Sequence, residues 1–171
     1  MVLHSSSGNI VQTIYNYNGG QSTVEGVTKQ SNSFVEVDSR MRIEITPKFS
    51  NSRLLIQYNF LFGGNFSSAI TTFRIHSSTD NFSSNSVVSS LNTEGNRNFG
   101  HASHRLVDSD LNDRHTTQLL FTTPASNTNA RKYSLFALNE SNVLNYYHRT
   151  GTNNAGCSAT PPSVIVMEIG Q

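Results

Sequence analysis

Short segments in which apolar and polar residues alternate are the feature that most limits what this chain of 171 residues can fold into. In the clearest of them, Met41-Arg42-Ile43-Glu44-Ile45, the three apolar side chains share one face of an extended chain and the two charged side chains share the other. No stretch of ten or more residues spaces apolar side chains by three and four, so helices longer than a turn or two are not expected. The pattern predicts an all-β fold.

The same alternation marks the other strands, each bounded by Gly, Asn, Ser or Pro. The predicted strands are 10–17, 33–37, 41–45, 54–62, 70–76, 87–91, 116–121, 131–138, 142–149 and 163–169. Strands spaced by about 8 to 12 residues favour an antiparallel, jelly-roll-like β-sandwich. We expect 41–45 and 54–62 to form a hairpin, and 163–169, which is apolar on both faces, to be a buried closing strand. Residues 1–8 are expected to be a short arm and 9–171 a single domain.

The composition argues against several classes of partner. Charged residues make up 13% of the chain and the formal net charge is +1, so no basic surface is expected to bind nucleic acid or an anionic membrane. No apolar run approaches the roughly 20 residues of a membrane helix, and the first residues lack the pattern of a secretory signal. We therefore expect synthesis in a cytoplasm without membrane insertion. The single cysteine, Cys157, excludes an internal disulfide framework.

Histidines offer the sharpest hypothesis for a metal site. His101 and His104 are three residues apart, and His115 follows Asp110 and Asp113. The spacing of the first pair suits one face of a helix, whereas the segment around it has the composition of a loop. We therefore predict no metal site and interpret these histidines as surface or interface residues.

The sequence has none of the local signatures that mark common catalytic sites. No G-x-S-x-G turn marks a nucleophile, and the paired glycines follow strands without leading into a helix, unlike those of a phosphate-binding loop. A glycosidase would need two carboxylates at a set separation. Glu94 with Asp108 or Asp110 would be such a pair, although nothing in the sequence selects them. We predict a protein that is not an enzyme and holds no cofactor.

Aromatic residues in polar loops are candidates for contact with a ligand, because a sugar ring stacks on an aromatic face while Asn, Ser and Asp side chains bond its hydroxyls. The candidate contact residues are Phe66, Phe82, Phe99, His101, His104, Tyr146 and Tyr147. They belong to loops expected around 63–68, 77–86, 92–104 and 139–155. The alternative is that each aromatic ring packs under its own loop.

Three segments carry a resemblance to a known family. The chain opens with Gly8-Asn9-Ile10-Val11-Gln12, continues through Ile45-Thr46-Pro47 and a Ser-containing turn into Ser52-Arg53-Leu54-Leu55-Ile56, and closes with the apolar strand Ser163-Val164-Ile165-Val166-Met167-Glu168-Ile169. In this order and spacing the segments resemble the tail-fibre tip and related virion surface domains of marine and cyanobacterial phages. A tail fibre normally has an attachment segment before such a domain, whereas here only Met1 to Gly8 precede the first strand.

The resemblance implies a β-sandwich that assembles as a homotrimer on the virion, with distal loops that bind a host surface polysaccharide or protein. We therefore predict a non-enzymatic phage virion protein of the tail-fibre-tip kind that contacts other fibre, tail or capsid subunits. The alternative is a trimeric capsid decoration (cement) protein that stabilises the phage head. A glycan depolymerase comes third.

Overall fold

The computed structural model describes residues 8–17, 26–64, 69–88, 100–105, 115–148 and 161–170. Within these ranges the chain is all-β, and its only helical segment is a 3-10 turn at Ser39–Met41. The strands are β1 (Ile10–Tyr17), β2 (Val27–Lys29), β3 (Val35–Glu36), β4 (Ile43–Ile45), β5 (Arg53–Gly64), β6 (Ile70–Ser78), β7 (Ser86–Val87), β8 (Ala102–Arg105), β9 (His115–Pro124), β10 (Arg131–Asn139), β11 (Asn145–Tyr147) and β12 (Ser163–Ile169). The all-β prediction is confirmed, although β2 and β8 were not predicted.

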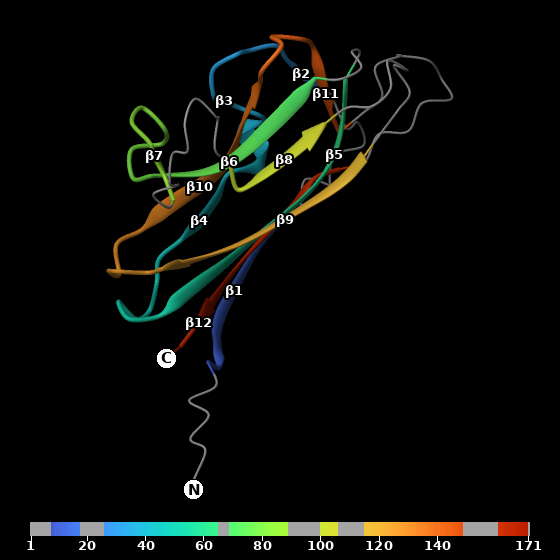
Figure 1. The fold of residues 1–171 in the computed structure, drawn as a ribbon. Helices are drawn as coiled ribbons and strands as arrows, with labels where there is room; N and C mark the ends of the chain where they lie inside the picture. The colour runs from blue at the N-terminus through green and yellow to red at the C-terminus, as the bar shows by residue number, and fades with distance from the viewer. Residues whose placement is uncertain are drawn as a thin grey trace, which may run out of the picture.

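The first sheet is organised around β5, whose twelve residues make it the longest strand. β9 pairs along one edge of β5, and the other edge pairs first with β12 and then with β11. β1 lies outside β12, and β2 lies outside β11. All of these pairs are antiparallel, and Figure 1 shows that the sheet is strongly twisted and curled.

The second sheet has β10 and β6 at its centre. β3 and β4 pair with the free edge of β10, and β7 and β8 pair with the free edge of β6. These pairs are antiparallel too, so both sheets meet the expectation of antiparallel pairing.

The hydrophobic core lies between the two sheets. Alternate residues of β5 point into it, as a strand with one buried face requires. The core residues from the central strands are Leu54, Ile56, Tyr58, Phe60 and Phe62 of β5, Val164 and Val166 of β12, Phe73 and Ile75 of β6, and Tyr133, Leu135 and Ala137 of β10. The Phe73 ring lies edge-on to Phe60 and Phe62, at centroid distances of 5.1 and 5.3 Å. Burying these aromatic rings is the main stabilising contribution of the core.

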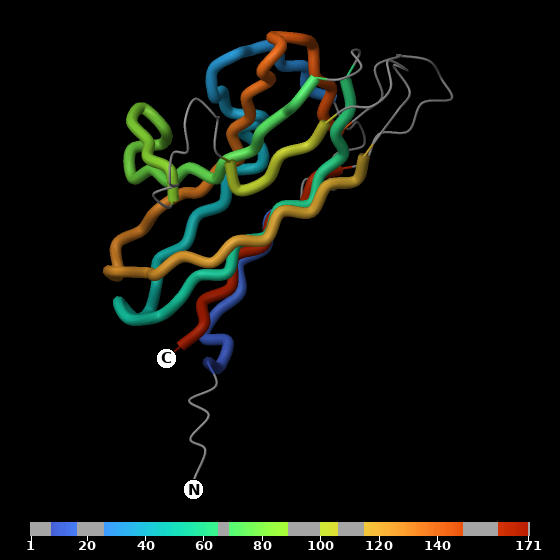
Figure 2. The backbone as a smooth tube through the Cα atoms, in the orientation of Figure 1, coloured from blue at the N-terminus to red at the C-terminus, as the bar shows by residue number. Residues whose placement is uncertain are grey.

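The expected hairpin of 41–45 with 54–62 is wrong. β4 pairs with β10 in the second sheet, whereas β5 belongs to the first sheet. The apolar face of the alternating segment is as predicted, because Met41, Ile43 and Ile45 are at most 2% exposed. Both strands therefore cover the same core, but from opposite sides, and the turn between them crosses from one sheet to the other (Figure 2).

A buried carboxylate holds this crossing. Glu168, which is 0% exposed, accepts hydrogen bonds from the backbone N–H groups of Lys48 and Phe49 at 2.9 Å, from the Ser52 hydroxyl at 2.7 Å and from the Gln12 amide at 2.6 Å. Burial by itself would raise the pKa of Glu168, but these donors bring the pKa down to about 2. The three segments that carry the phage resemblance contribute Gln12, the crossing turn and Glu168, so they meet at one ionised side chain.

A second buried carboxylate fixes the 3-10 turn. Asp38 accepts from the backbone N–H of Arg40 at 2.9 Å and forms an ion pair with its guanidinium at 2.8 Å. The wholly buried His148 ring lies 3.3 Å from the same carboxylate. Burial opposes ionisation of Asp38, but its contacts with His148 and Arg40 hold the pKa well below the ordinary value. The turn is thereby tied to the residue that follows β11.

The predicted contact loops do not share one end of the molecule. β5 and β10 end, and β6 begins, at one end, whereas β6 ends and β10 begins at the other. Loops expected at 63–68 and 139–155 therefore start at the first end, and 77–86 lies at the second. Within the described ranges, no helix is long and apolar enough to cross a membrane.

Candidate functional site

The candidate aromatic residues near β5 and β11 are not available on the surface. Tyr147 is wholly buried and Tyr146 is 8% exposed. The Tyr147 ring packs on Phe62 at a centroid distance of 5.6 Å. The expectation that these two tyrosines are exposed is therefore wrong, because β11 joins the edge of β5 and places them in the core. Phe66 and Phe99 lie outside the described residues.

Phe82 is half-buried on the outer face of the second sheet. Its ring centroid lies 5.9 Å from that of Phe136, and the Arg42 guanidinium lies over the ring at 4.8 Å. The alternative reading, in which the ring packs under its own loop, therefore describes Phe82. Its backbone has φ of 70°, which is strained for a bulky residue.

His101 has a structural position between the edges of the two sheets. Its Nδ1 accepts a hydrogen bond from the backbone N–H of Ile75 at 3.0 Å, and its ring lies 4.3 Å from that of Phe121. Burial, followed by the nearby His76 and Arg74, lowers the pKa of His101 to about 4. The ring is neutral at pH 7 and closes the gap between the sheets.

His104 and His115 face each other from β8 and β9, with ring centroids 4.2 Å apart. They border a cavity of about 470 Å³, and the His104 ring lies edge-on to Phe62. The structure thus brings these two histidines together and leaves His101 apart from them. Nowhere in the described part of the chain do three or more His, Cys, Asp or Glu side chains gather in a way that could hold a metal ion.

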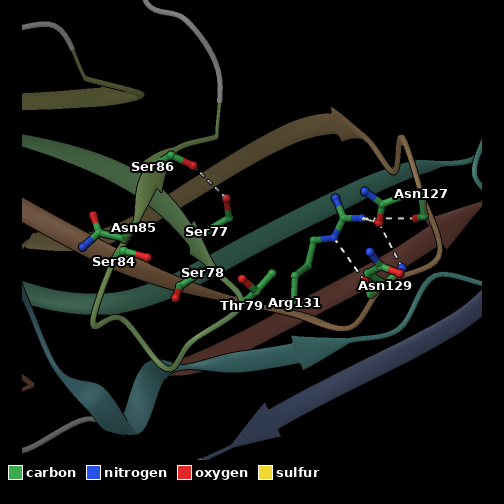
Figure 3. Close-up of a pocket in the computed structure, with 9 residues that line it drawn as sticks. All are labelled: Ser77, Ser78, Thr79, Ser84, Asn85, Ser86, Asn127, Asn129 and Arg131. Atoms are coloured by element: carbon green, nitrogen blue, oxygen red, sulfur yellow. Dashed lines mark hydrogen bonds between the residues drawn. The ribbon is translucent and has the colours of Figure 1, made fainter.

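A polar groove lies at the end where β6 stops and β10 starts, between the β6–β7 loop (79–85) and the β9–β10 turn (125–130). Its volume is about 350 Å³. Hydroxyl and amide side chains make up all of its lining except for one guanidinium: Ser77, Ser78, Thr79, Ser84, Asn85, Ser86, Asn127, Asn129 and Arg131. Figure 3 shows these side chains, with Arg131 between the loop and the turn.

The groove continues on both sides of Arg131. A hollow of about 390 Å³ shares Ser77 and Arg131 with it. A second hollow, of about 220 Å³, shares Ser78, Thr79 and Arg131 and carries the charged residues Glu44, Asp80 and Lys132. Arg131 therefore stands at the centre of an extended polar depression.

Asp80 organises the β6–β7 loop. Its carboxylate accepts hydrogen bonds from the Ser84 hydroxyl at 2.5 Å, from the Ser78 hydroxyl at 2.7 Å and from the Ser84 backbone N–H at 3.0 Å. These contacts, with Ser84 the largest contributor, lower the pKa of Asp80 to about 2. Ser77 and Ser86 form a further hydroxyl contact at 3.5 Å across the base of the loop (Figure 3). The loop is therefore held in one shape by its own side chains.

The β9–β10 turn orients Arg131. The Arg131 Nε donates to the Asn129 carbonyl at 3.4 Å, and its Nη2 donates to the carbonyl and the side-chain oxygen of Asn127. The same Asn127 oxygen accepts from the Asn129 backbone N–H at 2.9 Å, as drawn in Figure 3. The guanidinium is thus fixed by the turn from which it extends.

Backbone strain is concentrated around this groove. Five described residues other than glycine have a positive φ, and three of them, Asn81, Phe82 and Ser126, flank the groove with φ of 60°, 70° and 63°. Such conformations cost free energy and gather at ligand-binding sites. The loop at 77–86 was predicted from the sequence as a contact loop, whereas the turn at 125–130 was not. The run Ser126-Asn127-Thr128-Asn129 before Arg131 is the signal that would have found it.

Chemically, the groove is equipped for binding. None of the ion pairs between described residues includes Arg131, so its charge has no carboxylate partner among them. The surrounding hydroxyls and amides both donate and accept hydrogen bonds. This combination can hold a hydroxylated ligand and an anionic group.

Comparisons with known proteins add no family to this description. No protein-family model matches the sequence, and no curated protein matches it. The proposed function therefore rests on the residues of this chain and their geometry.

Proposed function

We propose that this protein is a non-enzymatic phage virion structural protein that attaches to a host surface in the manner of a tail-fibre tip. The observation that carries the proposal is the polar groove, with its Ser, Thr and Asn lining and its fixed Arg131. A pre-shaped, solvent-open surface of hydrogen-bonding side chains suits the hydroxyls of a host polysaccharide. The resemblance of the opening, middle and closing segments to virion surface domains supports the same function.

As part of this proposal, we assign the all-β fold more specifically to a jelly-roll-like β-sandwich. Its support is that two antiparallel sheets contribute to one core, with consecutive segments such as β4 and β5 on opposite sides. The exposed loops and turns at the two ends of the sheets are then the surfaces open to partners.

A homotrimer is the assembly that we propose, and the outer face of the first sheet supports it. Tyr15, Ile165, Gln57 and Leu120 stand opposite one another across β1, β12, β5 and β9, with Leu120 58% and Tyr15 56% exposed. Half-buried Met167 lies on the same face. A row of this kind, apolar except for Gln57, is favourably covered by another subunit.

The outer face of the second sheet differs, because the chain covers it with its own residues. His76 stacks on Phe136 at a centroid distance of 4.2 Å, and the Arg74 guanidinium lies 3.8 Å from the centre of the Phe34 ring. We therefore expect subunits to meet through the first sheet. Light scattering after size-exclusion chromatography should give a mass of three times 18.9 kDa. Leu120→Lys should shift the protein toward monomer, whereas a monomeric wild type would contradict the trimer.

Attachment is tested with the purified full chain. Fluorescently labelled protein should bind cells of the phage's host, and an excess of unlabelled protein should reduce adsorption of the phage. Prior removal of the surface polysaccharide from the cells should abolish binding. Adsorption that stays unchanged at saturating protein would overturn the proposal of host attachment.

Capsid decoration is the second candidate, because the apolar outer face of the first sheet suits assembly on a regular shell as well as within a fibre. Location and copy number distinguish the two. Density for the protein on the capsid of the intact particle, with copies in the hundreds on a quantitative gel, would favour decoration. Density on the tail, with copies in the tens or fewer, would favour the fibre tip.

A further inference from the structure

The charge distribution in the polar groove narrows the kind of ligand that fits it. Arg131 is the only charged residue in its lining, and no ion pair between described residues involves its guanidinium. The acidic residues Glu44 and Asp80 border the neighbouring hollow instead, where Lys132 lies 3.6 Å from Glu44. The lining of the main groove therefore presents one positive charge among neutral hydrogen-bonding groups, although its Ser78 and Ser84 hydroxyls donate to the Asp80 carboxylate.

We propose that this groove binds an acidic saccharide, with the sugar carboxylate on the Arg131 guanidinium and the sugar hydroxyls on the surrounding Ser and Asn side chains. The inference rests on the proposed function, since it names the class of ligand that the attachment surface recognises. In this proposal, Arg131 is the residue that selects a negatively charged ligand over a neutral one.

Arg131 is suited to this role by its fixed position. Its Nε and Nη2 groups donate to Asn129 and Asn127, so the guanidinium is held in place before a ligand arrives. Arg131 also forms a side-chain hydrogen bond with Tyr133. A guanidinium has five N–H donors in a rigid plane, so at least one donor remains for a carboxylate beyond these contacts. A pre-organised donor loses little conformational entropy on binding.

The uncharged residues that line the groove favour a saccharide as the ligand. A volume of about 350 Å³ exceeds what a small ion needs and lies at the lower end of the range for small-molecule sites. The groove has no apolar lining residue that would select a hydrophobic side chain. Eight hydroxyl and amide side chains instead match a ring that carries several hydroxyls.

The absence of an aromatic ring from the lining favours an acidic sugar over a neutral one. Neutral sugars gain much of their affinity by stacking on an aromatic face. The nearest candidate, Phe82, is turned onto Phe136 and Arg42 and does not line the groove. Affinity must therefore come from hydrogen bonds, and those to a charged group are the strongest.

The test is calorimetric titration of the full chain with oligogalacturonate and, separately, with its methyl ester, which has the same hydroxyls but no charge. The acid should bind at least about tenfold more tightly than the ester. Arg131→Gln should weaken binding of the acid by about ten- to a hundredfold, and Arg131→Lys should retain part of the affinity. Arg105→Gln removes the same charge from an exposed site on β8, opposite Ile70 at the end of β6 away from the groove, and should leave binding unchanged.

Several outcomes would overturn the inference. Equal affinity for the acid and its ester would do so, as would Arg131→Gln binding like Arg105→Gln. Inorganic sulfate that binds as tightly as the oligosaccharide would reduce the groove to an anion site. If Arg131→Gln does not fold, amide shift mapping on the wild type decides instead. The acid should then perturb Ser84, Ser86, Asn127 and Asn129, and shifts confined to other residues would contradict the proposal.

The two proposals fail separately. Attachment to host cells without binding of the acid would overturn the ligand class and leave the attachment function standing. Binding of the acid without attachment to host cells would overturn the attachment function, and the groove would remain an acidic-saccharide site.

Discussion

The Glu168 cluster and the Arg131 groove lie at the same end of the molecule and are built from similar parts, yet they differ in solvent access. Each places one charged side chain among hydroxyls, amides and backbone groups. Glu168 is 0% exposed and its carboxylate accepts from four neighbouring residues. Arg131 is half-buried and lines the open groove of about 350 Å³. The closed cluster therefore stabilises the fold, whereas the open groove retains hydrogen-bonding capacity for a ligand.

The largest expected effect comes from Glu168→Gln. The amide group would turn an N–H₂ toward backbone and hydroxyl donors, which leaves buried donors without acceptors. We expect a loss of about 3 kcal/mol in the free energy of unfolding, measured by urea denaturation.

The matched control is Glu44→Gln. Glu44 is exposed and lies 3.6 Å from Lys132, so the same substitution there should change stability by no more than about 0.5 kcal/mol. Equal losses in the two variants would show that the buried cluster is not a special source of stability.

A fall in pH should lower the free energy of unfolding by less than the Glu168→Gln substitution does. The pKa of Glu168 in the fold is about 2, below its ordinary value of 4.5, so its contribution is present above about pH 5 and is lost as the pH falls toward 2. The stability difference between wild type and Glu168→Gln should therefore shrink by about 2 kcal/mol between pH 7 and pH 3. Urea denaturation of both proteins at several pH values measures this. A difference that does not change with pH would contradict the ionised state of Glu168.

The smallest effect is expected beside the groove. Ser126, in the exposed β9–β10 turn, has φ of 63°, a conformation that glycine adopts without steric cost. Ser126→Gly should stabilise the protein by about 0.5 kcal/mol, because relief of strain outweighs the extra freedom of the unfolded chain. Ser126→Val should instead destabilise it, because a branched side chain raises that strain. Thermal denaturation of both variants checks this, and stabilisation by valine would contradict the turn geometry.

Much of the strand pattern could be predicted from the sequence. The segments 10–17 and 163–169 match β1 and β12 residue for residue, because period-two alternation and flanking turn residues are local signals. The short strands β2 and β8 were missed. Each has only three or four residues, and its pairing with a neighbouring strand, not its own pattern, makes it a strand.

The candidate site was predicted only in part. The loop at 77–86 does line the groove, but Tyr146 and Tyr147 are core residues, and His101 bridges two sheets. Exposure of a loop aromatic depends on which strand its neighbours join, and the sequence does not give that pairing. The groove itself needs the turn at 125–130, which begins about forty residues after the end of the loop it faces.

The sequence was sufficient to predict an all-β fold, the core-facing residues of clearly alternating strands such as 41–45, and the approximate position of most strands. These properties follow from side-chain polarity over a few residues. The sequence did not predict that β4 and β5 lie in different sheets, that Gln12, Ser52 and Glu168 meet, or that Arg131 stands in a groove. These depend on contacts between distant segments, where the burial of apolar faces and the pairing of polar groups must be satisfied together.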